Sequence, residues 1–217
     1  VFTRPDIAFH VSRLASSMSS PSNEAYEYLL GVMRYLYNTK GLGITFGRVR
    51  DDAEDQMEQG RIYVWSDGSF NGPGEHSPYG GGYVEYYFGP ISWVARMLKF
   101  KPLSSAEQEV GAMMVMLKEG MFITRVAEDM GIKLKGAPTL LTDSQAGRDT
   151  VINPGVTKNT VHFERWLYYV REAYLKKKVD IVLVPDEKQR GDDKTKVVHK
   201  AKFEFCRKVQ LNLKDGD

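Results

Sequence analysis

Apolar residues recur at helical spacing in two stretches near the beginning of the chain. The spacing predicts helices over residues 5–18 and 22–37, each with one apolar face. Pro5 is typical of a first helical turn, and Ser22 can cap the second helix after the break at Pro21. The residues that define the two faces are Ile7, Val11 and Leu14 in the first helix and Tyr26, Leu29, Leu30, Met33 and Leu36 in the second.

The next segment contains first an alternating apolar pattern and then a highly charged stretch. Leu42, Ile44 and Phe46 alternate with smaller or polar residues, which predicts a short strand. Residues 49–60 then carry many charged side chains and almost no large apolar ones. We expect a linker there, followed by a second region that begins at Arg61.

From Arg61 onward, the pattern alternates between the strand period and the helix period. The run RIYVWSDGS is apolar on both faces, so we expect a central strand that is buried on both sides. Two further strand-like runs, GGYVEYYF and ISWVARM, are joined by Gly89-Pro90, where we expect a hairpin turn. The other predicted elements are a helical stretch over 106–130 with a potential break near Gly120, strands over 139–142 and 179–185, and helices over 160–177 and 192–208.

Composition narrows the class of protein without naming a partner. The net charge of +2 over 217 residues is too small to show that the chain binds a polyanion. Residues 176–217, however, contain twelve Lys or Arg against eight Asp or Glu, which permits nucleic-acid binding. Cys206 is the single cysteine, so an internal disulfide is excluded and an intracellular location is favoured. No apolar run is long enough to cross a bilayer, so we expect no membrane partner.

Four acidic residues stand at the ends of predicted elements. Asp67 ends the first strand, Glu109 lies near the start of the long helix, and Asp143 ends the fourth strand. Asp192 begins the last predicted helix. Such side chains can converge beyond the strand ends of an open sheet, where they would repel one another unless cations such as Mg²⁺ or Mn²⁺ neutralise them. Two bound ions would suit phosphodiester hydrolysis.

Five strings follow one another in the order and spacing of a known family: WSDGS, SSAEQEVGAM, LLTDSQAG, TVHFERWLYYVRE and VPDEKQRGDDKTK. They resemble the ribonuclease H domain of copia-type LTR retrotransposon Pol polyproteins. The N-terminal string TRPDIAFHVSRLASSMSSPSNEAYEYLLGVMRYLYNTKGLGITFG resembles the C-terminal end of the reverse transcriptase that precedes this domain. The resemblance implies an α/β, ribonuclease H-like fold, with a mixed five-stranded sheet flanked by helices and preceded by a small helical segment.

The same resemblance implies a division of the chain into four parts. Residues 1–48 would be the C-terminal remnant of the reverse transcriptase, and residues 49–60 a charged linker. Residues 61–210 would form the ribonuclease H-like domain, and residues 211–217 a tail. Two helices are too few for polymerisation, so we expect the first part to pack on the ribonuclease H domain, on the remainder of a reverse transcriptase or on a larger assembly.

The resemblance also assigns roles to individual residues. The four metal-binding and catalytic carboxylates of the ribonuclease H superfamily fall on Asp67, Glu109, Asp143 and Asp192, which would bind two Mg²⁺ or Mn²⁺ ions. Glu107 and Asp193 are alternatives for the second and fourth acid. Ser105 and Gln145 match positions that touch the nucleic-acid backbone in relatives, and their alternative roles are a helix N-cap and a solvated side chain.

The activity implied is metal-dependent endonucleolytic hydrolysis of the RNA strand of RNA/DNA hybrids, as in retrotransposon reverse transcription, in a cytoplasmic virus-like particle or in the nucleus. The alternative is a domesticated or inactive retrotransposon-derived subunit that binds nucleic acid or has a structural role. One departure from the pattern is the absence of a histidine between Pro185 and Gly191, where cellular and retroviral relatives carry a mobile one. His162 matches a histidine of the copia-type motif, although a packing role is favoured for it.

Overall fold

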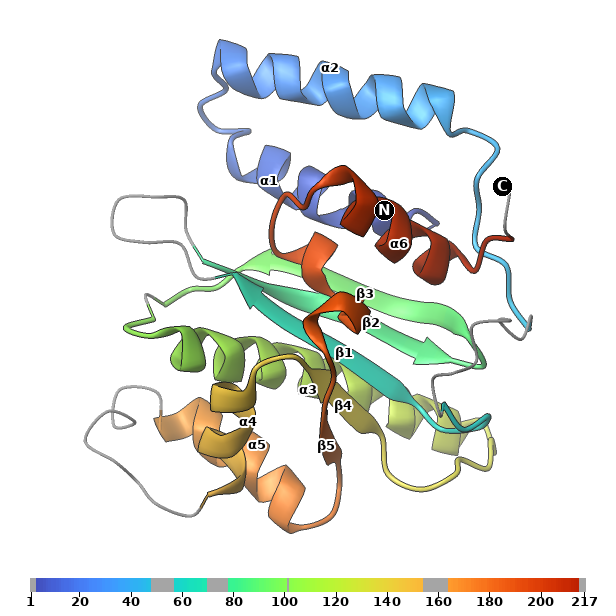
Figure 1. Ribbon diagram of the computed structural model, residues 1–217, viewed down its shortest axis with the longest axis vertical. Coiled ribbons are helices and arrows are strands. Elements are labelled where there is room, and N and C mark those ends of the chain that lie inside the picture. Colours follow the sequence, from blue (N-terminus) through green and yellow to red (C-terminus); the bar gives the residue numbers. More distant parts are fainter. Residues whose placement is uncertain (1–2, 48–56, 70–77, 101, 154–163, 215–217) are drawn as a thin grey trace.

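One mixed sheet of five strands lies at the centre of the molecule (Figure 1). The computed structural model describes residues 3–47, 57–69, 78–100, 102–153 and 164–214. The strand order is β3-β2-β1-β4-β5, in which β1, β2 and β3 are antiparallel neighbours while β4 and β5 run parallel to β1. The strands are β1 (Tyr63–Ser69), β2 (Tyr79–Tyr86), β3 (Gly89–Met97), β4 (Thr139–Thr142) and β5 (Asp180–Leu183).

Helices cover both faces of this sheet (Figure 1). One face carries α3 (Ser105–Asp129), α4 (Gln145–Ile152) and α5 (Glu164–Leu175). The other carries α1 (Ala8–Ser16) and α6 (Lys200–Leu211), with α2 (Asn23–Asn38) as an outer layer. The described residues also form the short 3₁₀ turns η1 (Pro5–Ile7), η3 (Asp186–Lys188) and η4 (Asp192–Lys194). The predicted fold class, a mixed five-stranded sheet flanked by helices and preceded by a helical segment, is confirmed.

The central strand β1 is buried on both faces, as its apolar pattern predicts. Ile62 and Val64 belong to the larger core, which fills the space under α3, α4 and α5. Tyr63 and Trp65 belong to a smaller cluster on the opposite face. Gly120 lets α3 approach this strand closely, because a Cβ atom there would lie 2.5 Å from Cγ2 of Val64.

The N-terminal helices are packed against the second face of the sheet. Phe9 is buried and meets the ring of Tyr79 on β2 edge to face, with 5.0 Å between ring centroids. Asp6 is buried as well, and its carboxylate accepts hydrogen bonds from Arg4 and from the Tyr35 hydroxyl of α2 at 2.6 Å. Downstream, the backbone N–H of Thr45 donates to the carbonyl of Leu211 at 3.0 Å. Contacts from both ends of the segment therefore join it to the sheet and to α6.

Two predictions about local structure before and within the sheet are wrong. The predicted strand over 42–46 is irregular backbone, and its hydrogen bond at Thr45 goes to a helix terminus rather than to a strand. The hairpin turn falls on Tyr87 and Phe88, both with positive φ, and Gly89 already begins β3. Such a turn matches the twist of a two-residue hairpin but normally selects Gly or Asn, so the pattern pointed to the glycine nearby.

The structure also answers two questions about the predicted helices: whether the long helix is broken near Gly120, and where the last helix begins. The long helix is continuous from Ser105 to Asp129, because Gly120 serves close packing rather than a break. The last helix begins at Lys200, not at Asp192. Asp192 lies on the separate turn η4, whose three residues are all buried. Most of the predicted linker over 49–60 lies outside the described residues.

Candidate active site

The sheet register brings two of the four predicted acids side by side. Trp65 of β1 pairs with Leu141 of the parallel strand β4. Asp67 and Asp143 each follow two residues later, so they reach the same edge of the sheet. Asp67 is buried within β1, while Asp143 is partly buried just after β4.

The third acid, Glu109, comes from the first turns of α3, which crosses this edge. Two glycines permit the approach. A Cβ at Gly68 would lie 3.0 Å from the backbone oxygen of Gln108, and a Cβ at Gly147 would lie 2.9 Å from the Cβ of Glu109. Any larger residue at either position would push the helix, or Glu109 itself, away from the strand ends.

Three of the predicted carboxylates converge. One oxygen each from Asp67, Glu109 and Asp143 can be chosen so that all lie within 4.8 Å of one another. Asp192 belongs to an adjoining group of the same size, which it forms with Asp143 and Asp186. Asp143 is common to both groups, so we call these five residues the acid cluster. Sequence reasoning had not singled out Asp186, which lies on the short turn η3.

The surroundings of Asp67, Glu109 and Asp143 disfavour the negative charge of these three carboxyl groups. Burial raises the pKa of Asp67 to about 6, and the charges of Asp192 and Asp143 add to the increase. Burial is also the main reason why the pKa of Glu109 lies well above its usual value, with Asp67 as the next cause. The pKa of Asp143 is raised by burial too, although a hydrogen bond from Gln189 opposes the shift. Carboxyl groups held in this way would be stabilised as anions by a nearby cation.

Lysine side chains supply part of that positive charge. Lys196 Nζ lies 2.6 Å from Oδ1 of Asp192 and 3.8 Å from Oδ2 of Asp67. Lys202 Nζ lies 2.8 Å from the other oxygen of Asp192. Asp67 also accepts a hydrogen bond from the hydroxyl of Thr195. These contacts neutralise Asp192 more fully than Asp67, while Glu109 Oε2 is buried without a hydrogen-bond partner among the described residues.

Gln189 ties the turn that carries Asp192 to the sheet. Its side-chain amide donates to the Ser66 carbonyl at 3.0 Å and to Asp143 Oδ1 at 3.4 Å. Its carbonyl oxygen accepts from the backbone N–H groups of Arg190 and Gly191. Sequence reasoning assigned no role to Gln189, Thr195 or Lys196. Their signal was the string VPDEKQRGDDKTK, in which only the acids were weighed.

The two alternative acids have other partners. Glu107 Oε2 accepts from the backbone N–H of Leu103 at 2.6 Å, and the Glu107 N–H donates to the Ser104 hydroxyl at 3.2 Å. Ser104 thus caps the start of α3, while the Glu107 side chain binds the backbone just before that cap. Asp193 is buried against Lys194, whose Nζ lies 2.5 Å from its Oδ2. Neither residue belongs to the groups of converging carboxylates.

The polar residues predicted to touch nucleic acid lie at the starts of helices. Ser105 is exposed on the first residue of α3, where the N-cap is Ser104 rather than Ser105. Gln145 begins α4 and donates to Asp149 Oδ1 at 2.6 Å across one helical turn. Both positions remain predictions for substrate contact. His162 lies outside the described residues.

The acid cluster suits divalent metal ions. Its donors are carboxylate oxygens, the ligands that Mg²⁺ and Mn²⁺ prefer, and three of them lie close enough to share an ion. The unpartnered oxygen of Glu109 and the raised pKa values of Asp67, Glu109 and Asp143 fit a site at which a cation would stabilise the ionised carboxylates. The residues that would hold such ions are Asp67, Glu109, Asp143 and Asp192, with Asp186 beside them.

Comparison with known proteins finds relatives among the Pol polyproteins of plant transposons and a secreted RxLR effector protein of Plasmopara viticola, which is 29% identical over 125 residues, 57% of this chain and 82% of the effector. No family model matches the chain. The chain is 27% identical over 210 residues to the retrovirus-related Pol polyprotein from transposon TNT 1-94 of Nicotiana tabacum, and 26% identical over 210 residues to that from transposon RE2 of Arabidopsis thaliana. Each alignment covers 96% of this chain, but only 15% and 14% of the two polyproteins.

Solved structures with a similar arrangement of helices and strands include that of LC11-RNase H1, isolated from compost by a metagenomic approach. It is 13% identical, with a TM-score of 0.49 over 63% of this chain and 94% of that chain. No helix among the described residues has the length and apolar character needed to cross a membrane. As the sequence motifs predicted, the chain is homologous over nearly its whole length to a segment of the retrovirus-related Pol polyproteins of plant transposons.

Proposed function

We propose that this chain is a metal-dependent ribonuclease H that cuts the RNA strand of RNA/DNA hybrids. The observation that carries the proposal is the convergence of Asp67, Glu109 and Asp143 from three separate elements to within 4.8 Å. Buried carboxylates repel one another and destabilise a fold, so their assembly calls for a function. Homology to transposon Pol polyproteins, which span several times the length of this chain, supports a role in reverse transcription.

The residues of the acid cluster would hold two Mg²⁺ or Mn²⁺ ions. Such ions would supply an activated water and stabilise the oxygen that leaves phosphorus. The chain itself contributes the rigid placement of the acids, through the sheet register of Asp67 and Asp143 and through the hydrogen bonds of Gln189. Selection of RNA would depend on contacts to the 2′-hydroxyl, which DNA lacks.

The test is cleavage of a hybrid in which each strand carries a different label, with Mg²⁺ or Mn²⁺ added. We expect metal-dependent cutting of the RNA strand alone. Asp67→Asn and Asp143→Asn should each lower the rate by about a thousandfold or more, because several kcal/mol of transition-state stabilisation depend on bound metal. Asp129→Asn, at the exposed end of α3, is the matched control and should cut normally. Equal rates for all four proteins would contradict the proposal.

One observation favours a second function, that of a nucleic-acid-binding or structural subunit without catalysis. Lys196 and Lys202 pair with both oxygens of Asp192, so part of the acid cluster is neutralised by the chain itself. A fold that no longer bound metal would need such internal cations. Hybrid binding that is unaffected by a chelator, with no cleavage in Mg²⁺ or Mn²⁺, would support this second function over the first.

A further inference from the structure

A cavity of about 580 Å³ lies beside the acid cluster, between the N-terminal helices and the chain that leads into α6. Its walls come from α1, α2, the residues that follow η4, and the first turn of α6. The volume is in the range of sites that bind small organic molecules or single nucleotides. The predicted two-metal chemistry makes no use of this space.

Aromatic rings form much of the wall. The ring centroids of Tyr35 and Phe203 are 5.6 Å apart, and the ring centroids of His10 and Tyr28 are 5.8 Å apart. The hydroxyls of both tyrosines already have partners, since Tyr35 donates to Asp6 and the Tyr28 hydroxyl lies 2.5 Å from Nδ1 of His10. What the rings offer to the cavity is therefore flat apolar surface, which suits a planar ligand.

Gly31 leaves room in this wall. It lies in the middle of α2, where glycine costs about 1 kcal/mol relative to alanine. Close packing does not explain it, because a Cβ atom built at Gly31 would meet no heavy atom within 4 Å. The glycine lines the cavity and keeps it open, at a cost to the stability of the helix.

One lysine belongs to both the cavity and the acid cluster. Lys196 lines the cavity, while its Nζ lies 2.6 Å from Asp192 Oδ1 and 3.8 Å from Asp67 Oδ2. Lys200, with a side chain that is 88% exposed, lies on the same wall. Lys196 thus connects the wall of the cavity to the acid cluster, and Lys200 adds a second positive charge to that wall.

We propose that this cavity binds one nucleotide of a single strand that continues from the hybrid beyond the cleavage site. The base would stack on the rings of Tyr28 and Phe203, and Lys200 would contact its phosphate. Of the acids in the wall, Asp193 is already paired with Lys194, and exposed Glu27 can accept hydrogen bonds from the amino groups of a base. The inference rests on the proposed ribonuclease H function and adds to it a subsite for unpaired nucleic acid.

The experiment compares the affinities of a blunt hybrid and of hybrids with a three-nucleotide single-stranded extension. Fluorescence anisotropy is measured with Ca²⁺ in place of Mg²⁺, and the extension is placed on each strand in turn. For the native chain, we expect one of the extensions to tighten binding by about tenfold or more, the usual effect of one stacked base. Adenosine monophosphate should remove this gain without weakening the blunt hybrid if a single nucleotide accounts for it.

Gly31→Leu adds a side chain to the cavity wall, its Cβ meets no heavy atom within 4 Å, and leucine also favours the helix, so the variant should fold. It should bind the blunt hybrid as the native chain does and lose the gain from the extension. Gly41→Leu is the matched control, since a Cβ there also meets nothing within 4 Å and Gly41 is not part of the cavity wall. It should keep the gain.

Two outcomes would overturn the inference: no gain from either extension in the native chain, or a gain that survives Gly31→Leu. Failure of the proposed function is separable, because it would appear as absent cleavage of the blunt hybrid in Mg²⁺ or Mn²⁺. If the blunt hybrid does not bind at all, binding of a labelled single-stranded oligonucleotide to the native chain and to Gly31→Leu tests the cavity directly. Equal affinities there would again overturn the inference.

Discussion

At the scale of single residues, Asp67, Glu109 and Asp143 destabilise the folded state when they are ionised without a neighbouring cation. Burial raises the pKa of Asp67 from 3.8 to about 6, and the pKa values of Glu109 and Asp143 are raised for the same first reason. A carboxyl group with a raised pKa in the folded chain stabilises that chain only while it is protonated. This contribution is complete below the unfolded-state pKa near 4 and is lost as the pH rises through about 6.

The metal-free chain should therefore become less stable as the pH rises from 4 toward 7. For Asp67 alone, the difference between 3.8 and about 6 corresponds to a loss on the order of 3 kcal/mol. Asp67→Asn should remove that loss and raise the melting temperature at pH 7 in the presence of a chelator. Thermal unfolding followed by circular dichroism at several pH values measures both effects. If the melting temperature of the native chain rises from pH 4 to pH 7 as much as that of Asp67→Asn, the raised pKa of Asp67 is contradicted.

At the scale of elements, the start of α3 separates a backbone-binding acid from a site acid two residues apart. Glu107→Ala removes the acceptor of the Leu103 N–H and should lower the free energy of unfolding by about 1 kcal/mol, while cleavage continues. Glu109→Gln should do the reverse, with cleavage lost and stability kept or increased, because the buried charge disappears. Urea unfolding and the hybrid cleavage assay distinguish the two. If Glu107→Ala loses cleavage although the protein is fully folded, Glu107 rather than Glu109 belongs to the site.

Two glycines in helices should respond to alanine in opposite ways. At Gly120 the new Cβ would lie 2.5 Å from Val64 Cγ2, so overpacking of about 1–3 kcal/mol should outweigh the gain in helix propensity. At Gly31 the new Cβ meets nothing within 4 Å, so alanine should stabilise the chain by up to about 1 kcal/mol. Chemical denaturation of both variants tests the contrast. Val64→Ala should partly rescue Gly120→Ala, and absence of rescue would show that the clash lies elsewhere.

The sequence predicts elements better than it predicts how they end. Period and propensity are local, and they place β4 at Thr139–Thr142 without error. The turn at Tyr87 and Phe88 and the start of α6 were missed, because neither depends on local preference alone. The residues of η4 are buried and paired with distant groups such as Gln210, which holds Asp193 and Lys194. Such contacts, rather than helix propensity, decide where that segment bends.

For the candidate site, motif spacing located the acidic residues but not the side chains that contact them. Asp67 and Asp143 follow strands, so a pattern of strand ends can find them. Gln189 reaches Asp143 and Lys196 reaches Asp67, each more than 40 positions away, and no local pattern marks such contacts. The cavity escaped prediction for the same reason, since its walls join α1 and α2 to the opposite end of the chain.

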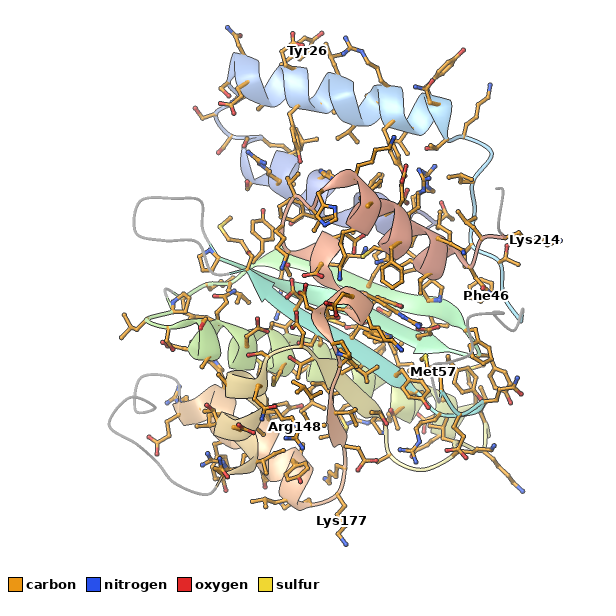
Figure 2. All side chains as sticks on the ribbon, in the orientation of Figure 1. Tyr26, Phe46, Met57, Arg148, Lys177 and Lys214 are labelled. Atoms are coloured by element: carbon orange, nitrogen blue, oxygen red, sulfur yellow. The ribbon has the colours of Figure 1, made fainter. Side chains whose placement is uncertain are left out.

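At the scale of the whole molecule, the N-terminal helices behave as part of one packed unit. Phe9 meets Tyr79 on the sheet, and Tyr35 meets Phe203 on α6. The outer side of α2 is different, because it exposes an apolar stripe to which Tyr26 belongs, away from the sheet (Figure 2). A segment that is apolar on both sides suits a position between the sheet and a further part of a larger assembly.

Deletion of residues 1–47 should therefore destabilise the remaining chain by several kcal/mol. It exposes the part of the second face that α1 covers, removes buried Ile7 and Phe9, each worth about 1.5–3 kcal/mol, and breaks the bond from Thr45 to Leu211. The loss should reach the acid cluster, because α6 and η4 pack beside the deleted helices, so cleavage should fall with stability. Urea unfolding of the full chain and the fragment measures the difference, with Met33→Ser on the exposed side of α2 as a control that should stay within about 0.5 kcal/mol of the native value. A fragment as stable as the full chain would show that the ribonuclease H-like region folds independently of the helices before it.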